Sequence, residues 1–423
     1  MISVAEALRT VLEATPLLSV EEVALGALAG RVVAEPVTST RAVPGADNSA
    51  MDGFAVRAAD VVEAGARLRV VGRVPAGSVR SEPLVRGTAV EIYTGSVVPP
   101  GADTVVRVED TERDGETVVV TTAIARAANV RRAGEDVAPG DTVLAPGTVL
   151  GAADVGVLAS IGCTTVRVHR RPRVAIVSTG AELVGVDETP GPGQIVNSNA
   201  HALAVAVGEA GAESVVLPPV GDRFEDIRAQ LSEAAACDVV LSTGGVSVGD
   251  FDFVKEALDA LGVERAFWKV AQKPGRPLTF GRRGDHLFFG LPGNPVSALV
   301  CFYVYVWPVL RGMQGHGARH LPTAEATLAG PIRKRAGLTE FVRVQLAMGD
   351  GGLTATPAAS QSSGVLSAMT AGAGLLIAPA GRGEIEAGER LTVIVPAALA
   401  LATADPAPAL GTDSPASAEH DNS

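Results

Sequence analysis

The stretch from residue 174 to 310 most constrains the fold, because short apolar runs alternate there with segments of helical spacing. Strands buried on both faces, with helices between them, are typical of a parallel, doubly wound sheet with right-handed crossovers. The predicted strands are 174–177, 214–217, 239–241 and 287–289, and the predicted helices are 200–210, 224–236 and 253–261.

A glycine-rich loop, STGGVSVGDFD, follows the third of these strands, from Ser242 to Asp252. Glycines let backbone approach a ligand closely, and free amides at a helix N-terminus can hold an anion. Many α/β turns need the same glycines merely to reverse the chain, so both explanations stay open for the loop alone. Ligands of such sheets bind outside the carboxyl ends of the strands, which is where this loop falls.

The regions before residue 174 and after residue 310 do not show this regular alternation of strands and helices. Apolar residues repeat at helical spacing over 4–12, and Ser19 with Glu22 forms a capping-box pattern that predicts a second helix over 19–28. Further strands are predicted at 68–74, 89–93, 104–108, 117–121, 341–346 and 391–394, and a further helix at 150–161.

These patterns divide the chain at a few points. Residues 41–138 form a β-rich domain, 170–319 the α/β domain, and 320–400 a final β domain, with a basic hinge at 169–173. The mixed pieces 1–40 and 139–169 flank the β-rich domain. The tail 401–423 is rich in Ala, Pro, Asp and Ser, a composition typical of disorder.

Composition excludes some classes of function. A net charge of -12 disfavours a nucleic-acid binder, which needs a basic face. The three cysteines have no zinc-binding spacing, and the N-terminus lacks a secretory pattern, so a reducing cytoplasm is expected. The longest apolar run, 298–310, is shorter than the roughly 20 residues of a membrane span and predicts a buried helix.

Polar residues gather in the loops that follow the predicted strands. Asn197 and its neighbours are expected to cap a helix, and Asp222 suits either a cap or a ligand contact. The basic residues of WKVAQKPGRP favour anion binding over a merely solvated loop, because two prolines restrain them. These basic residues are Lys269, Lys273 and Arg276.

The β-rich domain offers acids from separate loops. SAMDGF contains Asp52, YTG contains Thr94, and GED ends at Asp136. Turn chemistry explains each loop by itself. Together the loops supply oxygen ligands of the kind that a hard divalent cation takes.

SAMDGFA, TGSVVPPGADTVV, RPRVAIVSTGAEL, DVVLSTGGVSVGDFD, KPGRP and GLPGNPVSA stand in this order in the chain. Together they resemble the molybdopterin molybdenumtransferase family (MoeA, the family of the gephyrin E domain) over residues 1 to 400. The resemblance implies four domains: an elongated first domain built from 1–40 and 139–169, the β-rich insert, an α/β domain similar to molybdopterin adenylyltransferase, and a β-barrel-like domain.

The resemblance also implies an activity. Family members place molybdenum from molybdate on adenylylated molybdopterin and release AMP with a divalent cation, usually Mg²⁺. They act as homodimers, in which residues matching Asp52 and Thr94 reach the site of the other subunit. The molybdopterin adenylyltransferase is a further expected partner.

Family roles carry over to matching positions of this chain. Catalytic roles are implied for Asp52, Thr94, Asp136, Glu182, Asp222 and Asp252, the last three also as metal ligands. Binding roles are implied for Ser178, Thr179, Gly180, Thr243, Gly244, Gly245, Ser247, Lys269, Lys273, Arg276, Pro292, Gly293, Asn294, Pro295, Arg343 and Ser363. The match is looser around Arg343 and Ser363, where Leu338 and Ser362 replace the family's usual Arg and Gly.

Two other functions remain to be separated from this one. The first is adenylylation of molybdopterin by ATP, although relatives with that activity usually continue the two glycines with Thr-Gly, where this chain has Val246 and Ser247. The second is a non-catalytic molybdopterin-binding scaffold.

Overall fold

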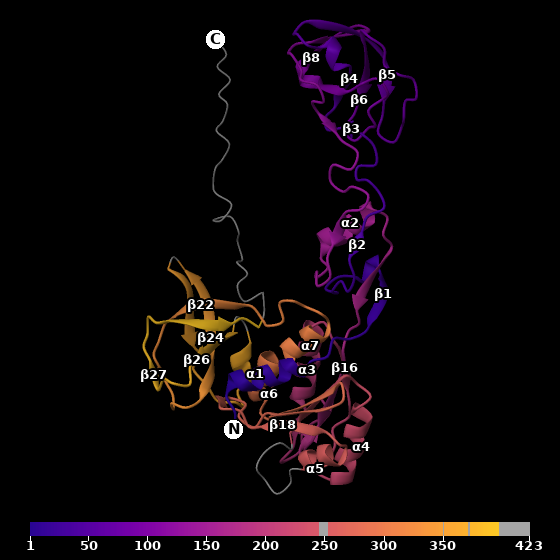
Figure 1. The fold of residues 1–423 in the computed structure, drawn as a ribbon. Coiled ribbons are helices and arrows are strands. Elements are labelled where there is room, and N and C mark those ends of the chain that lie inside the picture. The colour runs from indigo at the N-terminus through magenta and orange to yellow at the C-terminus, as the bar shows by residue number, and fades with distance from the viewer. Residues whose placement is uncertain (245–252, 350, 371–372, 397–423) are drawn as a thin grey trace. The chain divides into compact units, whose positions relative to one another are not determined.

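The computed structural model describes residues 1–244, 253–349, 351–370 and 373–396 (Figure 1). The chain divides into two compact units. The main unit joins Met1–Ser19 to the chain from His169 onward, and the inserted unit is Val20–Val168. The finer domain boundaries near 41, 139 and 320 stay predictions, and the predicted disordered tail lies outside the described residues.

A six-stranded sheet forms the centre of the main unit. Its order is β16 (Glu213–Val216), β13 (Arg173–Ser178), β17 (Val239–Thr243), β21 (His286–Leu291), β20 (Thr279–Arg283) and β18 (Glu264–Trp268). The first four are parallel neighbours, as predicted. β20 is antiparallel to both of its neighbours, so β18 runs in the same direction as β21. The sequence patterns missed β18 and β20.

Helices cover both faces of this sheet, which confirms the doubly wound arrangement. In β13, Val174 and Ile176 belong to one buried cluster, which contains residues of α3 (Ser198–Glu209). Ala175 and Val177 point to the other face and join residues of α4 (Phe224–Ala234) and α5 (Phe253–Ala260). Successive side chains of the strand point to opposite faces of the sheet, so they belong to two separate hydrophobic cores.

The long apolar helix runs from Pro295 to Met313 as α6 (Pro295–Cys301), a π-helical segment (Phe302–Val306) and α7 (Trp307–Met313). It is long and apolar enough to cross a membrane, but 89% of its most apolar window is buried inside the protein. The predicted buried helix is thus confirmed. The N-terminal helix α1 (Val4–Glu13), capped by Ser3 and Glu6, packs against its second half.

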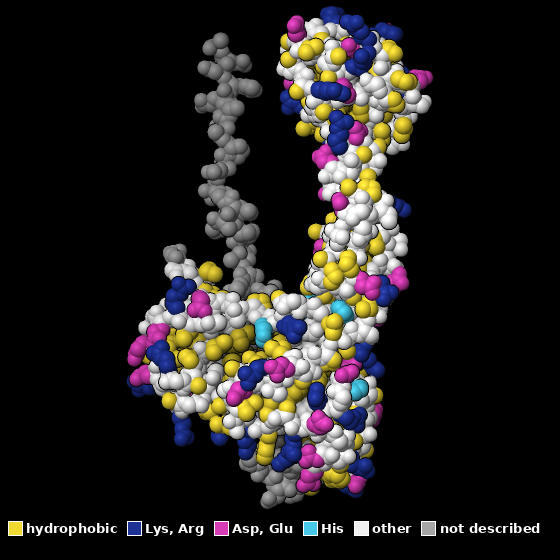
Figure 2. Space-filling model, in the orientation of Figure 1, with side chains coloured by type: hydrophobic (Ala, Val, Ile, Leu, Met, Phe, Trp, Pro, Cys, Tyr) yellow, Lys and Arg dark blue, Asp and Glu magenta, His cyan; other side chains and the backbone are white. Residues whose placement is uncertain are grey.

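The final domain contains a closed β-barrel. Five strands form the ring, because β24 pairs with both β25 and β26. They are β22 (Thr323–Leu328), β24 (Thr339–Gly349), β25 (Gly352–Pro357), β26 (Ala373–Ala378) and β28 (Arg390–Ile394). Apolar side chains gather on the face where α1 meets this barrel (Figure 2), around a groove of about 470 Å³ lined by residues such as Leu8 and Phe341.

The inserted unit contains a six-stranded β-sheet that confirms the four strands predicted there. Its order is β7 (Thr104–Arg107), β4 (Gly53–Val56), β6 (Thr88–Ile92), β5 (Ala66–Val74), β9 (Thr117–Val120) and β8 (Thr111–Asp114). The predicted helix at 150–161 is also present as α2 (Ala152–Ser160).

The predicted helix at 19–28 is wrong. Val20–Ala24 is a strand, β1, which pairs with β12 (Thr165–His169), and only a 3₁₀ turn, Leu25–Ala27, follows it. Glu22, expected in a capping box, instead accepts a hydrogen bond from the hydroxyl of Thr165. Pairing with a strand more than 140 positions away along the chain overrides the local capping pattern.

Phe289→Ala should destabilise the main unit by about 3–5 kcal/mol, since this side chain of a central strand is 1% exposed and its ring centre lies 4.8 Å from that of Phe280. Urea unfolding followed by tryptophan emission measures the change. Val216→Ala on the edge strand, where the side chain is 44% exposed, is the matched control and should cost less than about 0.5 kcal/mol. Equal effects of the two changes would contradict the assigned core.

Candidate functional site

The candidate site lies at the carboxyl edge of the parallel strands. From β13 the chain crosses to β16 on one side of the sheet, and it then returns to β17 on the other side. The strand order therefore reverses between β13 and β17, and ligands of doubly wound sheets bind at such a point. Ser178 and Thr243, the last residues of these two strands, are register partners.

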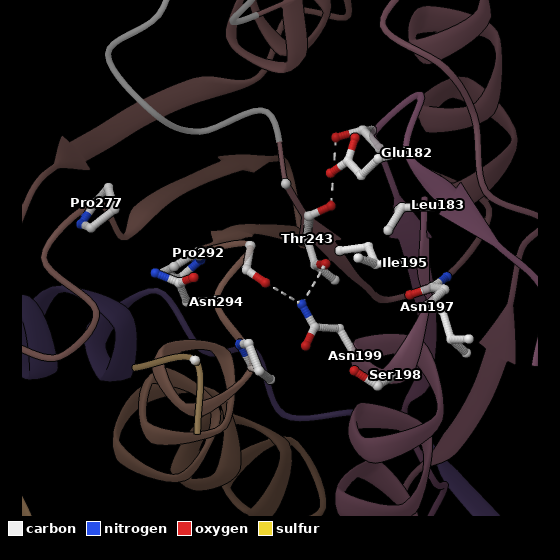
Figure 3. Close-up of a pocket in the computed structure, with 16 residues that line it drawn as sticks. Glu182, Leu183, Ile195, Asn197, Ser198, Asn199, Thr243, Pro277, Pro292 and Asn294 are labelled. Atoms are coloured by element: carbon white, nitrogen blue, oxygen red, sulfur yellow. Dashed lines mark hydrogen bonds between the residues drawn. The ribbon is translucent and has the colours of Figure 1, made fainter. Parts of the chain in front are cut away.

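A pocket of about 580 Å³ opens at this edge (Figure 3). It contains eight of the predicted site residues: Thr179, Glu182, Thr243, Gly244, Pro292, Gly293, Asn294 and Pro295. Sequence reasoning did not predict the other lining residues: Leu183, Ile195, Val196, Asn197, Ser198, Asn199, Pro277 and Gly364. The pocket is therefore lined by polar side chains, three prolines and backbone, as small-molecule sites often are.

Asn199 joins two loops of the pocket. Its Nδ2 donates to the carbonyl of Gly293 at 2.7 Å and to Oγ1 of Thr243 at 3.2 Å, as Figure 3 shows. Its neighbour Asn197 caps α3 as predicted, accepting from the amide of Ala200. Sequence reasoning treated both as caps because it predicted that the helix begins at residue 200, whereas α3 begins at Ser198 and includes Asn199.

Gly244 brings two loops into very close approach. A Cβ at this residue would stand 2.2 Å from the carbonyl oxygen of Thr179, and its φ is +89°. Only glycine satisfies both conditions. The continuation of the loop, including Gly245, Ser247 and Asp252, lies outside the described residues.

Two predicted acids meet at the turn after β13. Asp222 accepts a hydrogen bond from the amide of Ala181 at 3.3 Å, and the carboxylate oxygens of Glu182 lie 2.7 and 2.8 Å from the place of a Cβ on Gly180. Asp222 does not cap α4, whose N-cap residue is Arg223. Over the described ranges, no group of three or more His, Cys, Asp and Glu side chains is arranged to hold a metal ion.

The three predicted basic residues do not line the pocket. Lys273 pairs with Glu340 of the barrel at 3.4 Å. Lys269 places its ammonium 4.4 Å from the ring centre of Trp268. Arg276 is exposed. The sequence suggested one anion-binding loop, but in the structure its three basic side chains have different neighbours.

A loop of the barrel domain reaches the start of α6. Ser363 Oγ accepts from Asn294 Nδ2 at 3.0 Å, and its carbonyl accepts from the amide of Val296. Arg343 is 1% exposed and donates to the carbonyls of Ser360 and Ser362. Burial lowers the pKa of Arg343. In this geometry Arg343 positions the loop, and its contact with a ligand stays a prediction.

The inserted unit brings Asp52 and Thr94 together. Oδ1 of Asp52 accepts from the amide of Thr94 at 2.7 Å and from its hydroxyl at 2.9 Å. Both hydrogen bonds lower the pKa of Asp52, and the bond from the backbone N–H of Thr94 has the larger effect. Asp136 lies in another hollow of the same unit, lined also by Asn48 and Arg131. The catalytic roles of all three stay predictions.

The fold and pocket define a multidomain protein with a small-molecule site at the switch point of an α/β domain. Three family models match consecutive parts of the chain. They are the MoeA N-terminal region (domain I and II) at residues 2–162, the probable molybdopterin binding domain at 175–312, and the MoeA C-terminal region (domain IV) at 325–395.

Individual relatives agree with these models. The molybdopterin molybdenumtransferase of Bacillus subtilis is 35% identical over 93% of this chain and 94% of its own length, and that of a Nostoc species is 43% identical over 70% of each. The crystal structure of the molybdopterin biosynthesis moeA protein from Pyrococcus horikoshii superimposes with a TM-score of 0.81 at 30% identity, covering 94% of this chain and 99% of that one. This chain belongs to the MoeA family of molybdopterin molybdenumtransferases, which are transferases.

Gly244→Ala should lower the melting temperature of the full chain, because the added Cβ would meet the Thr179 carbonyl oxygen at 2.2 Å in a left-handed backbone. Differential scanning calorimetry measures the shift. Gly221→Ala, in a neighbouring loop where a Cβ would meet no atom within 4 Å, is the control and should leave the temperature nearly unchanged. A Gly244→Ala protein as stable as the control would refute the close approach.

Thr94→Val should raise the pKa of Asp52 part of the way toward its ordinary value, since the hydroxyl donor is lost while the amide donor remains. Because the folded pKa is lowered, the contribution of ionised Asp52 to stability is present at neutral pH and is lost as the pH falls through that pKa. A carboxyl-carbon NMR titration measures the shift. Asp47, bonded to Ala133 and Arg132, is the internal control, and a shift at both acids would contradict the assignment.

Proposed function

We propose that this chain transfers molybdenum from molybdate to adenylylated molybdopterin, with release of AMP, in molybdenum cofactor biosynthesis. The observation that carries the proposal is the pocket at the strand switch point, in the part of the chain that matches the probable molybdopterin binding domain. The family membership favours this activity over adenylylation by ATP and over a non-catalytic scaffold.

The pocket suits a flat, polar ligand with a phosphate group. Asn199, Thr243 and Asn294 supply donors and acceptors, while Pro292 and Pro295 hold the turn before α6 in shape. Gly364, in a loop of the barrel domain, also lines the pocket. Positioning the ligand in this way is the main contribution these residues make to catalysis.

The acids at the turn after β13 fit a magnesium ion. Glu182 and Asp222 both approach residues 180–181, and Mg²⁺ usually binds one or two carboxylates together with substrate phosphate and water. When bound, the ion polarises a phosphate linkage as a Lewis acid. The residue matching the third acid of the family, Asp252, lies outside the described residues.

The proposed active form is a cytoplasmic homodimer with a shared site. Thr94 donates to Asp52 and lowers its pKa, so the Asp52 carboxylate is ionised at neutral pH, as a group that orients a metal or substrate must be. In the MoeA family, the residues that match Asp52 and Thr94 reach the active site of the other subunit. Molybdopterin adenylyltransferase, which makes the substrate, is a proposed partner.

The purified chain, given adenylylated molybdopterin, molybdate and Mg²⁺, should release AMP, measured by chromatography. Asp52→Ala should lower turnover about 10²-fold or more, the scale for losing a positioned electrostatic group. Glu182→Ala should be similarly impaired. Mixing the two variants should restore partial activity, because one site of a mixed dimer then has both intact acids.

Three outcomes would count against these assignments. No AMP release by the wild type would refute the activity. Unchanged turnover in Asp52→Ala would mean that Asp52 only stabilises its turn and has no catalytic role. Mixed variants that stay inactive, although size-exclusion chromatography shows a dimer, would refute the shared site.

A further inference from the structure

Gln272 is a fully buried polar residue next to a loop that reaches the pocket. Its side chain is 0% exposed, and it begins the short strand β19 (Gln272–Lys273), directly before this loop. A buried amide costs free energy unless both its oxygen and its nitrogen are hydrogen-bonded. An apolar side chain of similar size would avoid that cost, so the bonds that Gln272 forms are informative.

The partners of the Gln272 amide come from two parts of the chain. Nε2 donates to the carbonyls of Pro274 and Gly275 at 3.1 and 3.2 Å, so the side chain holds its own loop from the inside. Oε1 accepts from the hydroxyl of Tyr305. Burial raises the pKa of that hydroxyl, so Tyr305 stays protonated and donates. One side chain thus ties the loop to the long apolar helix.

The helix meets the loop through a second residue, Cys301. Its thiol is 0% exposed, accepts from Nε2 of Gln272 at 3.5 Å and donates to the carbonyl of Gly275 at 3.6 Å. Cys301 ends α6, and Tyr305 lies in the π-helical segment that follows. Single π-helical turns occur frequently at functional sites. Here the turn lies where the helix presents both residues to Gln272.

Gly275 lets the loop approach α6 closely. Its φ is +85°, and a Cβ on this residue would stand 2.4 Å from Sγ of Cys301 and 2.9 Å from Nε2 of Gln272. Only glycine satisfies both conditions. The backbone of the loop therefore rests directly on the helix.

The loop leads from Gln272 to the wall of the pocket. The amide of Val270 donates to the carbonyl of Arg276 at 3.0 Å and closes the loop. Pro277, the next residue, lines the pocket (Figure 3). The place of Pro277 is therefore set by a short, closed loop whose interior holds the side chain of Gln272.

The helix on which the loop rests also reaches the pocket. α6 begins at Pro295, which is another lining residue. The loop and the helix therefore both contribute to the wall, and they contact each other at Gly275 and Cys301. A change in this contact would change the spacing between the two parts of the wall.

We infer that Gln272, held by Tyr305 and Cys301, is a positioning residue for the substrate pocket. It fixes the loop that carries Pro277 against α6, although it is too deeply buried to touch the substrate itself. A fully bonded buried network specifies one geometry, whereas an apolar residue would leave the two carbonyls of the loop unbonded. The identity of the substrate rests on the proposed function.

Gln272→Met tests this inference, because methionine has a similar size and forms none of these bonds. It should raise the dissociation constant of molybdopterin about tenfold, the scale of one lost hydrogen bond. Anaerobic ultrafiltration without molybdate or Mg²⁺ measures this binding. Hydrogen exchange of segment 270–277, followed by mass spectrometry, should become faster because the loop is loosened. Circular dichroism checks that the variant is folded.

Tyr305→Phe is a milder second variant. It removes the donor to Oε1 but keeps the bonds from Nε2 to the loop, so the dissociation constant should rise by a smaller factor. In the double variant with Gln272→Met it should cause no further loss of binding, because the hydroxyl acts only through the Gln272 amide. Additive losses would mean that the two residues act independently, and this would overturn the inference.

The matched control is Gln314→Met. Gln314 is 2% exposed and donates to the carbonyls of Ala210 and Leu310 at 3.0 and 2.9 Å. It follows α7, roughly 28 Å from Pro295 by the rise of a helix. It should lower the melting temperature, yet leave molybdopterin binding and the exchange of 270–277 unchanged. A loss of binding equal to that of Gln272→Met would mean that only stability matters, and would overturn the inference.

Turnover separates positioning from chemistry. In the AMP-release assay, Gln272→Met should raise KM for adenylylated molybdopterin about tenfold and change kcat little, because the acids of the site are intact. A lowered kcat with unchanged KM would contradict a role in shaping the pocket. Wild-type molybdopterin binding by Gln272→Met, or wild-type exchange in its loop, would also overturn the inference.

The inference and the proposed function fail in different ways. Binding of molybdopterin that Gln272→Met weakens, without AMP release by the wild type, would refute the proposed function and leave the positioning role. AMP release by the wild type, with undiminished molybdopterin binding in Gln272→Met, would refute the positioning role and leave the function. A wild-type chain that binds no molybdopterin would overturn both.

Discussion

The site depends on the close approach of two loops at the ends of β13 and β17. The parallel register pairs Ser178 with Thr243, so the chain after each strand emerges at the same level. Gly244 then passes so near the carbonyl of Thr179 that no side chain fits between them. Thr179 and Gly244 line the pocket together with Glu182, and Asn199 bonds to Thr243 directly before this contact.

The net charge of the chain and the charge around its lysines differ in sign. The chain has a net charge of -12, yet the proposed function requires that it bind anions. The lysines have different local surroundings: the ammonium groups of Lys255 and Lys269 lie near the ring of Trp268, while Lys273 pairs with Glu340. Coulomb interactions fall off within about 8 Å in physiological salt, so nearby cations outweigh distant acids.

Much of the fold could be predicted from hydrophobic period alone. Buried strands such as β13 and β17 and the apolar helix from Pro295 to Met313 carry patterns that few other structures satisfy. The error at Val20–Ala24 has a physical cause, because its partner strand lies far along the chain and no local signal reports it. The strands β18 and β20 were missed because Arg and Gly interrupt their apolar runs.

The sequence by itself determined the family, the doubly wound α/β domain and half of the residues that line the pocket, since glycine, proline and strand patterns are visible in short stretches of sequence. Only the tertiary structure decided how the polar side chains are shared out. It turned Asp222 from a possible cap toward the amide of Ala181, buried Arg343 beneath the loop that carries Ser363, and placed Lys255 with Lys269 on one ring. Such pairings join residues from different loops, and the distances between loops depend on the packing of the whole domain.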